Sequence, residues 1–199
     1  MNKKIELIKT EFDEILLSDE PSNGLRIMIN NGNMKTFIPE VKNMIGFNQH
    51  TPYHDYDVFE HTLKVVDNVP AQLDVRLAAF FHDIGKPYCL TIDKDGVGHF
   101  KGHNILSAEM TFDILTRLDY DSSIIEKVVL LVRYHYIKDI RTKKISLEEY
   151  IAKVKMENLR DMFALCRADV KGKSENAKIE VVNELELKIR EYLNNKNYN

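Results

Sequence analysis

The sequence predicts an all-α protein whose helices pack around one buried central helix. In residues 3–17, apolar side chains recur at the spacing of an amphipathic helix. Residues 73–81 are apolar almost all the way round, and a helix without a polar face is expected to be buried. Strand signals are confined to residues 91–100, where Asp93-Lys94-Asp95-Gly96 predicts the turn of one short β-hairpin.

Shorter segments complete the helical pattern. Residues 18–23 predict a turn around Pro21, a short helix is expected at residues 25–30, and residues 34–45 are expected to stay helical around Pro39. Asp57 suits the N-cap of the next helix. Beyond the hairpin, further helices are expected at residues 105–118, 122–136, 146–154, 158–170 and 174–193.

The central helix ends in the stretch His82-Asp83-Ile84-Gly85-Lys86-Pro87. Gly85 is expected to take the left-handed conformation that closes a helix, and Pro87 to stop the helix from continuing. A histidine and a carboxylate therefore lie together at the end of a buried helix. Because a buried, unpaired carboxylate is energetically unfavourable, this pair predicts either an ion pair or a bound metal.

The composition limits what the protein can be. Its 199 residues, 44% hydrophobic and 30% charged, suit one globular domain. The chain has no run of about 18 or more apolar residues and begins with a charged helix, so a cytoplasmic location without membrane contact is expected. The net charge of -3 gives no broad attraction to nucleic acid, and DNA is not an expected partner. Cys89 and Cys166 are too far apart for a zinc knuckle, so nitrogen and oxygen ligands are expected.

Polar residues that interrupt apolar helix faces are the candidates for chemistry. His61, His135 and Asp169 each follow an apolar residue of their own segment by three positions, so they are expected to point inward with it. The end of the central helix adds a histidine and an aspartate, and another histidine stands just before the next helix. The candidate metal ligands are His61, His82, Asp83, His103, His135 and Asp169.

Each of these residues also has a plainer explanation. A single histidine on an apolar face is more often a hydrogen-bonded core residue than a ligand. The two aspartates could pair with arginines, for which the candidates are Arg76, Arg133 and Arg167. We favour the metal because coincidence at six positions is much rarer. Imidazole and carboxylate ligands suit iron, manganese, nickel, cobalt or zinc, held either as one ion by a subset or as two ions bridged by Asp83.

Lys86 comes directly after the expected helix end, three residues after Asp83. A lysine at such a position is commonly a solvated surface residue. Beside a metal that lowers the pKa of bound water toward ~7, its ammonium group would instead neutralise a phosphate oxygen in the transition state. Asp83 and Lys86 together therefore predict a catalytic centre for phosphoester hydrolysis.

The stretch His82-Asp83-Ile84-Gly85-Lys86, taken with His61 and Asp169, resembles the signature of the HD superfamily of metal-dependent phosphohydrolases. His103 and His135 extend the likeness to the two-metal members of that superfamily. Residues 22–26, 37–40, 56–63 and 164–169 are similar to the neck and HD portion of bacterial CCA-adding tRNA nucleotidyltransferases. The resemblance extends over residues 3–173.

The resemblance implies an HD-domain helical bundle with a C-terminal helix at residues 51–199, and a neck-like helical segment at residues 1–50. The nucleotide-adding head of that family has no counterpart before Lys3, so nucleotide addition is not expected. The implied activity is that of a phosphomonoesterase or cyclic phosphodiesterase acting on a nucleotide or an RNA-end phosphate. Lys86, Arg26 and Lys101 are the expected substrate-binding residues.

Two other interpretations stay open. The chain could be an RNA-binding module with a structural metal, an idea motivated by its N-terminal helices, and RNA is therefore a candidate partner. Less favoured is a two-iron oxygenase, because a few relatives in the superfamily activate oxygen. His50 and His54 precede the first ligand helix and are expected near the mouth of the site.

Overall fold

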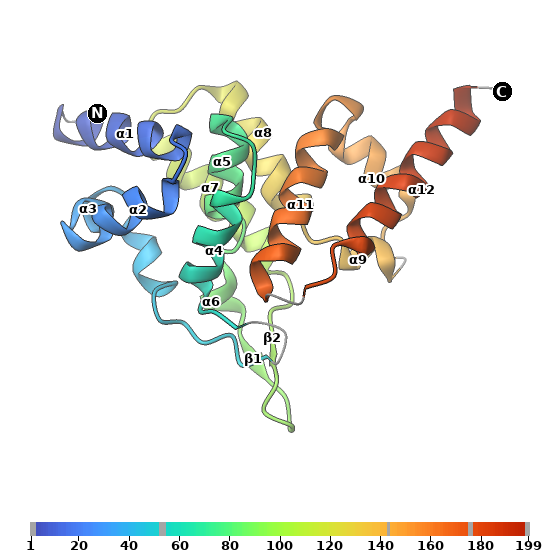
Figure 1. Cartoon of the computed structure of the whole chain (residues 1–199), viewed down its shortest axis with the longest axis horizontal. Helices are drawn as coiled ribbons and strands as arrows, with labels where there is room; N and C mark the ends of the chain where they lie inside the picture. The colour runs from blue at the N-terminus through green and yellow to red at the C-terminus, as the bar shows by residue number, and fades with distance from the viewer. Residues whose placement is uncertain (1–2, 52–54, 143, 175–176, 198–199) are drawn as a thin grey trace.

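Helix α5 (Leu73–Phe81) is the central element of the computed structural model (Figure 1). The structure describes residues 3–51, 55–142, 144–174 and 177–197. All α5 side chains from Val75 to Phe81 are buried, because α5 contacts α1, α4 and α8 on different sides. The predicted all-α fold around a buried central helix is confirmed.

The elements occur along the chain in three groups. Before the hairpin lie α1 (Lys3–Leu17), α2 (Pro21–Asn30), α3 (Asn33–Phe37), the 3-10 helix η1 (Pro39–Asn43), α4 (Val58–Asp67), α5 and α6 (Lys86–Cys89). The hairpin consists of β1 (Thr91–Ile92) and β2 (Gly98–His99). After it come α7 (His103–Arg117), α8 (Ser122–Tyr134), α9 (Lys138–Arg141), α10 (Leu147–Val154), the 3-10 helix η2 (Met156–Asn158), α11 (Leu159–Lys173) and α12 (Glu180–Asn197).

These groups lie next to one another in the order of the chain. Figure 1 shows α1 to α3 at one end, α4, α5, α7 and α8 in the middle, and α9 to α12 at the other end, with the hairpin projecting below. Antiparallel pairing joins Thr91 to His99 and Ile92 to Gly98, as expected for a hairpin. Within the described ranges, no helix combines the length and the apolar character needed to cross a bilayer.

The N-terminal helices share one hydrophobic core with the rest of the chain. The ring of Phe12 on α1 meets Phe80 of α5 edge to face at 5.1 Å and Phe37 of α3 at 5.4 Å between centroids. Phe12 is fully buried. The core continues from Ile8 on α1 to Ile189 on α12. The division of the chain at residue 50 therefore stays a prediction.

Several expected boundaries differ from the structure. Helix α2 begins at Pro21, where a turn was expected, because proline suits the first turn of a helix. The helix expected at residues 34–45 is interrupted at Ile38, and Pro39 begins the 3-10 helix η1. Helix α12 begins at Glu180, later than the expected residue 174.

The expected capping role of Asp57 is confirmed, whereas the expected role of Gly85 is wrong. The backbone N–H of Glu60 donates to Asp57 Oδ1 at 2.7 Å, which caps α4. Gly85 has φ −83° and ψ −13°, a right-handed conformation that other residues adopt equally well. Glycine is needed here for close approach: a Cβ atom would lie 2.8 Å from the backbone nitrogen of Ser107 and 3.0 Å from the carbonyl oxygen of His103.

Candidate metal centre

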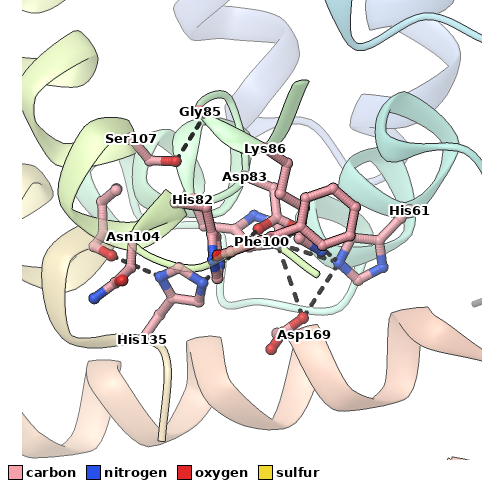
Figure 2. Close-up of polar contacts among 12 residues, drawn as sticks. His61, His82, Asp83, Gly85, Lys86, Phe100, Asn104, Ser107, His135 and Asp169 are labelled. Carbon is pink, nitrogen blue, oxygen red and sulfur yellow. Dashed lines mark hydrogen bonds and ion pairs between the residues drawn. The ribbon is translucent and has the colours of Figure 1, made fainter. Parts of the chain in front are cut away.

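The candidate ligands come from five different parts of the helical bundle. One lies in the middle of α4, one begins α7, one follows α8 and one lies on α11, while the histidine–aspartate pair follows α5 directly. All six side chains are buried: His61, His82, Asp83, His103, His135 and Asp169. Figure 2 shows Asp83 between His61, Asp169 and Lys86 on one side and His135 on the other. The bundle therefore brings the predicted residues to one place.

The six side chains form two groups of potential ligands that share Asp83. The first consists of His61, His82, Asp83 and Asp169, and the second of Asp83, His103 and His135. In each group, one ligand atom from every residue lies within 4.8 Å of the others. Each of the two groups could therefore hold one metal ion.

The carboxylate of Asp83 divides its two oxygens between the groups. Oδ2 lies 3.1 Å from His82 Nε2 and 3.4 Å from His61 Nε2. Oδ1 lies 3.5 Å from His103 Nε2 and 3.9 Å from His135 Nε2. In the first group, His61 Nε2 is 3.2 Å from both Asp169 Oδ1 and His82 Nε2. Asp83 therefore has the position of a bridging ligand.

Backbone carbonyls hold three of the imidazoles by the nitrogen that faces away from Asp83. Each Nδ1 contacts the carbonyl three residues earlier, at 2.7 Å for His82 and Ala79, 2.7 Å for His103 and Phe100, and 2.6 Å for His135 and Val132. A carbonyl only accepts, so Nδ1 carries the proton. In the neutral ring, Nε2 then presents a lone pair to the centre of the cluster, as metal-bound histidines do.

The residues fit a divalent transition-metal ion. Among the described residues, neither oxygen of buried Asp83 accepts a hydrogen bond of good geometry, although Lys86 Nζ lies 2.7 Å from Oδ2. His61 Nε2 and His82 Nε2 lie 3.2 Å apart beside this carboxylate. A cation at this point would be bound by the carboxylate and the ring nitrogens together. Cys166 lies nearby, but its Sγ contacts the carbonyl of His135, so the donor set is nitrogen and oxygen.

The surroundings keep the carboxylates ionised and two of the histidines neutral. Burial alone would raise the pKa of Asp83, but His82, Lys86 and His61 outweigh it and hold the pKa well below the usual range. The pKa of Asp169 is likewise held low against burial, mainly by Lys173. Burial lowers the pKa of His103 and, with the neighbouring histidines, lowers that of His135 to about 3. Deprotonated ligands of this kind are what a metal ion requires.

Two lysines pair with the ligand carboxylates. Lys86 is buried, and its Nζ lies 2.7 Å from Asp83 Oδ2 and donates to Gln49 Oε1 at 2.8 Å. Lys173 Nζ donates to Asp169 Oδ2 at 2.9 Å. The sequence reasoning missed Lys173 and Gln49. Lys173 stands four residues after Asp169 on α11, a spacing that could have identified it.

A cavity of about 510 Å³ opens beside the cluster. Asp83, Asp169, His103 and His135 line it together with five lysines: Lys86, Lys101, Lys138, Lys144 and Lys173. Three of these lysines pair with aspartates, whereas no ion pair is formed by Lys101 or Lys138 within the described part of the chain. The wall of the cavity can therefore attract an anion.

The other residues predicted near the site lie differently. Arg26 on α2 is paired with Glu60 on α4, so its guanidinium is directed to a neighbouring helix. Two of the alternative arginine partners for the aspartates bind elsewhere: Arg76 donates to the carbonyl of Val69, and Arg167 pairs with Glu186. Among the described residues, Arg133 forms no ion pair with either aspartate. His50 is exposed, and His54 lies outside the described residues.

The fold and the cluster define a class of protein. The sequence pattern of the HD domain family matches residues 53–169, and the chain belongs to this family. Over 137 residues the chain is 35% identical to the CC-adding tRNA nucleotidyltransferase of Thermus thermophilus, a match that covers 65% of this chain and 31% of that protein.

Two further relatives extend the likeness. The A-adding tRNA nucleotidyltransferase of Deinococcus radiodurans is 30% identical over 67% of this chain and 32% of its own length. The multifunctional CCA protein of Ralstonia nicotianae is 29% identical over 79% of this chain and 38% of its own length. The chain thus spans about a third of the curated relatives that it matches, and it resembles their HD portion.

Proposed function

We propose that this protein is a metal-dependent phosphohydrolase that cleaves a phosphomonoester or a cyclic phosphodiester of a nucleotide or an RNA end. One observation carries the proposal: a buried carboxylate, Asp83, lies between two groups of histidine nitrogens at the base of a lysine-lined cavity. The names of the relatives refer to tRNA nucleotidyl transfer, which supports a nucleotide or RNA end as the substrate class.

The proposed ligands are the four histidines and two aspartates of the cluster, holding one or two ions of iron, manganese, nickel, cobalt or zinc. When bound, such an ion supplies a Lewis acid that activates water and polarises a phosphoryl oxygen. The backbone carbonyls fix the imidazole orientations, so the ligands need little rearrangement to bind the ion.

The lysines of the cavity are proposed to bind the substrate phosphate and to neutralise its charge. Lys86 is held against Asp83 and Gln49 beneath the ring of Phe100, whose centroid lies 5.5 Å from Nζ. This position suits an ammonium group that neutralises charge on a phosphoryl oxygen as the ester bond breaks. Lys101, which is exposed at the edge of the same cavity, is proposed to bind the substrate phosphate as it enters.

The test combines metal content with turnover. The protein is loaded in turn with Mn²⁺, Ni²⁺, Fe²⁺, Co²⁺ and Zn²⁺ and assayed against 2′,3′-cyclic nucleotides, 2′-nucleotides and nucleoside monophosphates. Asp83→Asn removes the shared carboxylate charge, so it is expected to lose most bound metal and at least about 100-fold in turnover.

Asp113→Asn on α7 provides the matched control, because it makes the same change at an exposed site. It should retain both metal and activity. A fully loaded wild-type protein that hydrolyses none of these substrates would overturn the proposal. RNA binding that persists in Asp83→Asn would then favour an RNA-binding module with a structural metal.

A further inference from the structure

A second cavity adjoins the one beside the metal centre. It has a volume of about 300 Å³, near the lower end of the range for small-molecule sites. The two cavities share five lining residues: Asn104, Ile105, Tyr136, Asp139 and Lys144. They are therefore neighbouring compartments, and a ligand in the first can extend into the second.

An aromatic ring stands at the boundary between them. Tyr136 follows the candidate ligand His135, lines both cavities, and is only partly buried. Its ring meets the ring of His103 edge to face, with 5.0 Å between the centroids and 81° between the planes. The contact with a metal-centre residue fixes the position of the Tyr136 ring relative to the ligands.

The second cavity is lined by more tyrosines than the first, three against one. Beyond Tyr136, its wall includes the rings of Tyr134 and Tyr150 and the side chains of Ile105, Ile140 and Ile145. The rest of the lining is polar, with the charged or amide side chains of Asn104, Arg133, Asp139, Lys144, Glu149 and Lys153. Asn104 Nδ2 donates to the carbonyl of Arg133 at 2.8 Å, which orients the amide, and Glu149 adds a carboxylate. Tyrosine rings beside hydrogen-bonding side chains suit a planar heterocycle that has polar atoms at its edges.

We propose that the second cavity, walled by Tyr136, Tyr134 and Ile145, binds the base of a nucleotide whose phosphate lies at the metal centre. This inference rests on the proposed function and specifies its substrate class. Aromatic side chains bind bases by stacking, which needs no particular base sequence. A phosphate ester without a base would use the lysine-lined cavity alone.

The experiment compares substrates with and without a base. Wild-type protein loaded with its active metal is expected to cleave a nucleoside monophosphate with a kcat/KM about tenfold above that for ribose 5-phosphate. Tyr136→Ala is expected to reduce this ratio toward one by raising KM for the nucleotide, with metal content unchanged. Tyr136→Phe keeps the ring and should keep the ratio.

A matched tyrosine serves as the control. Tyr88 is exposed and contacts Asn43, away from both cavities, so Tyr88→Ala should leave the ratio unchanged. Equal kcat/KM for the two substrates in the wild type would overturn the base site while leaving hydrolysis in place. An equal loss for both substrates in Tyr136→Ala would overturn it too.

A binding measurement separates this inference from the proposed function. If the loaded protein turns over neither substrate, the proposed hydrolysis fails. The affinity for the free nucleoside, which carries no phosphate, then shows whether the second cavity binds a base. Binding that is weakened by Tyr136→Ala and not by Tyr136→Phe or Tyr88→Ala supports the site, and absence of nucleoside binding overturns it.

Discussion

At the scale of single residues, a lysine lies beside each of the two carboxylates of the cluster and partly compensates its charge. Lys86 contacts Asp83 at 2.7 Å and Lys173 contacts Asp169 at 2.9 Å. Buried carboxylates need such compensation, because removing an ionised group from water is strongly unfavourable. The same positive charges act against a divalent ion that approaches these carboxylates.

We therefore expect Lys173→Gln to raise the affinity for divalent metal by about tenfold, because it removes a positive charge next to Asp169. Competition with a chromophoric chelator measures the affinity. Lys171→Gln makes the same change on the same helix, where Lys171 donates to Asn68, and should leave the affinity unaltered. A weaker affinity in Lys173→Gln would mean that Lys173 serves chiefly to orient the carboxylate.

Residue spacing predicted the ligand positions better than their partners. The inward direction of His61 follows from helical periodicity, because neighbouring apolar residues of α4 need burial. The pairing of Lys86 with Gln49 depends on a contact across 37 positions of the chain, which no local pattern records. Arg26 was expected at the substrate site, yet a carboxylate of an adjacent helix, Glu60, pairs with its guanidinium.

At the scale of elements, glycines allow helices to approach the cluster closely. Gly172 on α11 packs against α4, where an added Cβ would lie 3.0 Å from Val65 Cγ2 and 3.2 Å from His61 Nδ1. Gly85 lies against the first turns of α7. The sequence predicted that Gly85 closes the central helix through a left-handed backbone conformation, but α5 ends at Phe81 and Gly85 is right-handed. No local pattern could show that α7 packs against Gly85, which is the actual reason for glycine at this position.

We expect Gly85→Ala to reduce the free energy of unfolding by about 2 kcal/mol, because overpacking against backbone atoms forces α7 away. Urea denaturation measures the change. Gly172→Ala is the comparison: its added methyl meets side chains, which move more easily, so a smaller loss is expected. A loss in Gly172→Ala equal to or larger than that in Gly85→Ala would contradict this explanation.

Element boundaries were predictable where a cap or a turn is encoded locally. Asp57 at the start of α4 and Gly96, with φ +78° in the hairpin turn, are such cases. Helix α9 (Lys138–Arg141) was missed because four residues carry too little periodicity to identify a helix. The start of α2 was missed because Pro21 suits both a turn and a first helical turn.

At the scale of the whole molecule, an ion pair links the N-terminal segment to the helices that carry the site. Arg117 of α7 donates to both carboxylate oxygens of Glu40 on η1, at 2.7 and 3.0 Å. Partial burial opposes ionisation of Glu40, but these hydrogen bonds outweigh it and lower its pKa. A lowered carboxyl pKa means that the pair stabilises the fold above the unfolded pKa of about 4.3.

The stabilisation is accordingly lost as the pH falls through the lower pKa of the folded state. We expect Glu40→Gln to reduce the free energy of unfolding by about 0.5 kcal/mol at pH 7, a small value because Arg117 is half exposed. The difference from wild type should shrink below about pH 4. Denaturation at several pH values measures it, with exposed Glu109→Gln as the control. A difference independent of pH would exclude the ion pair as its cause.

The first ligand group, which contains His61 and Asp169, offers a way to follow the assembly of the chain. His61 and Asp169 come within reach of each other only when α11 has docked on α4, more than a hundred positions away in the sequence. An ion that needs both residues binds the native chain and not the unfolded one, and it raises stability by about 2.7 kcal/mol at a hundredfold excess over Kd. The melting temperature with and without a chelator therefore gauges correct assembly in any variant, even before a substrate is known.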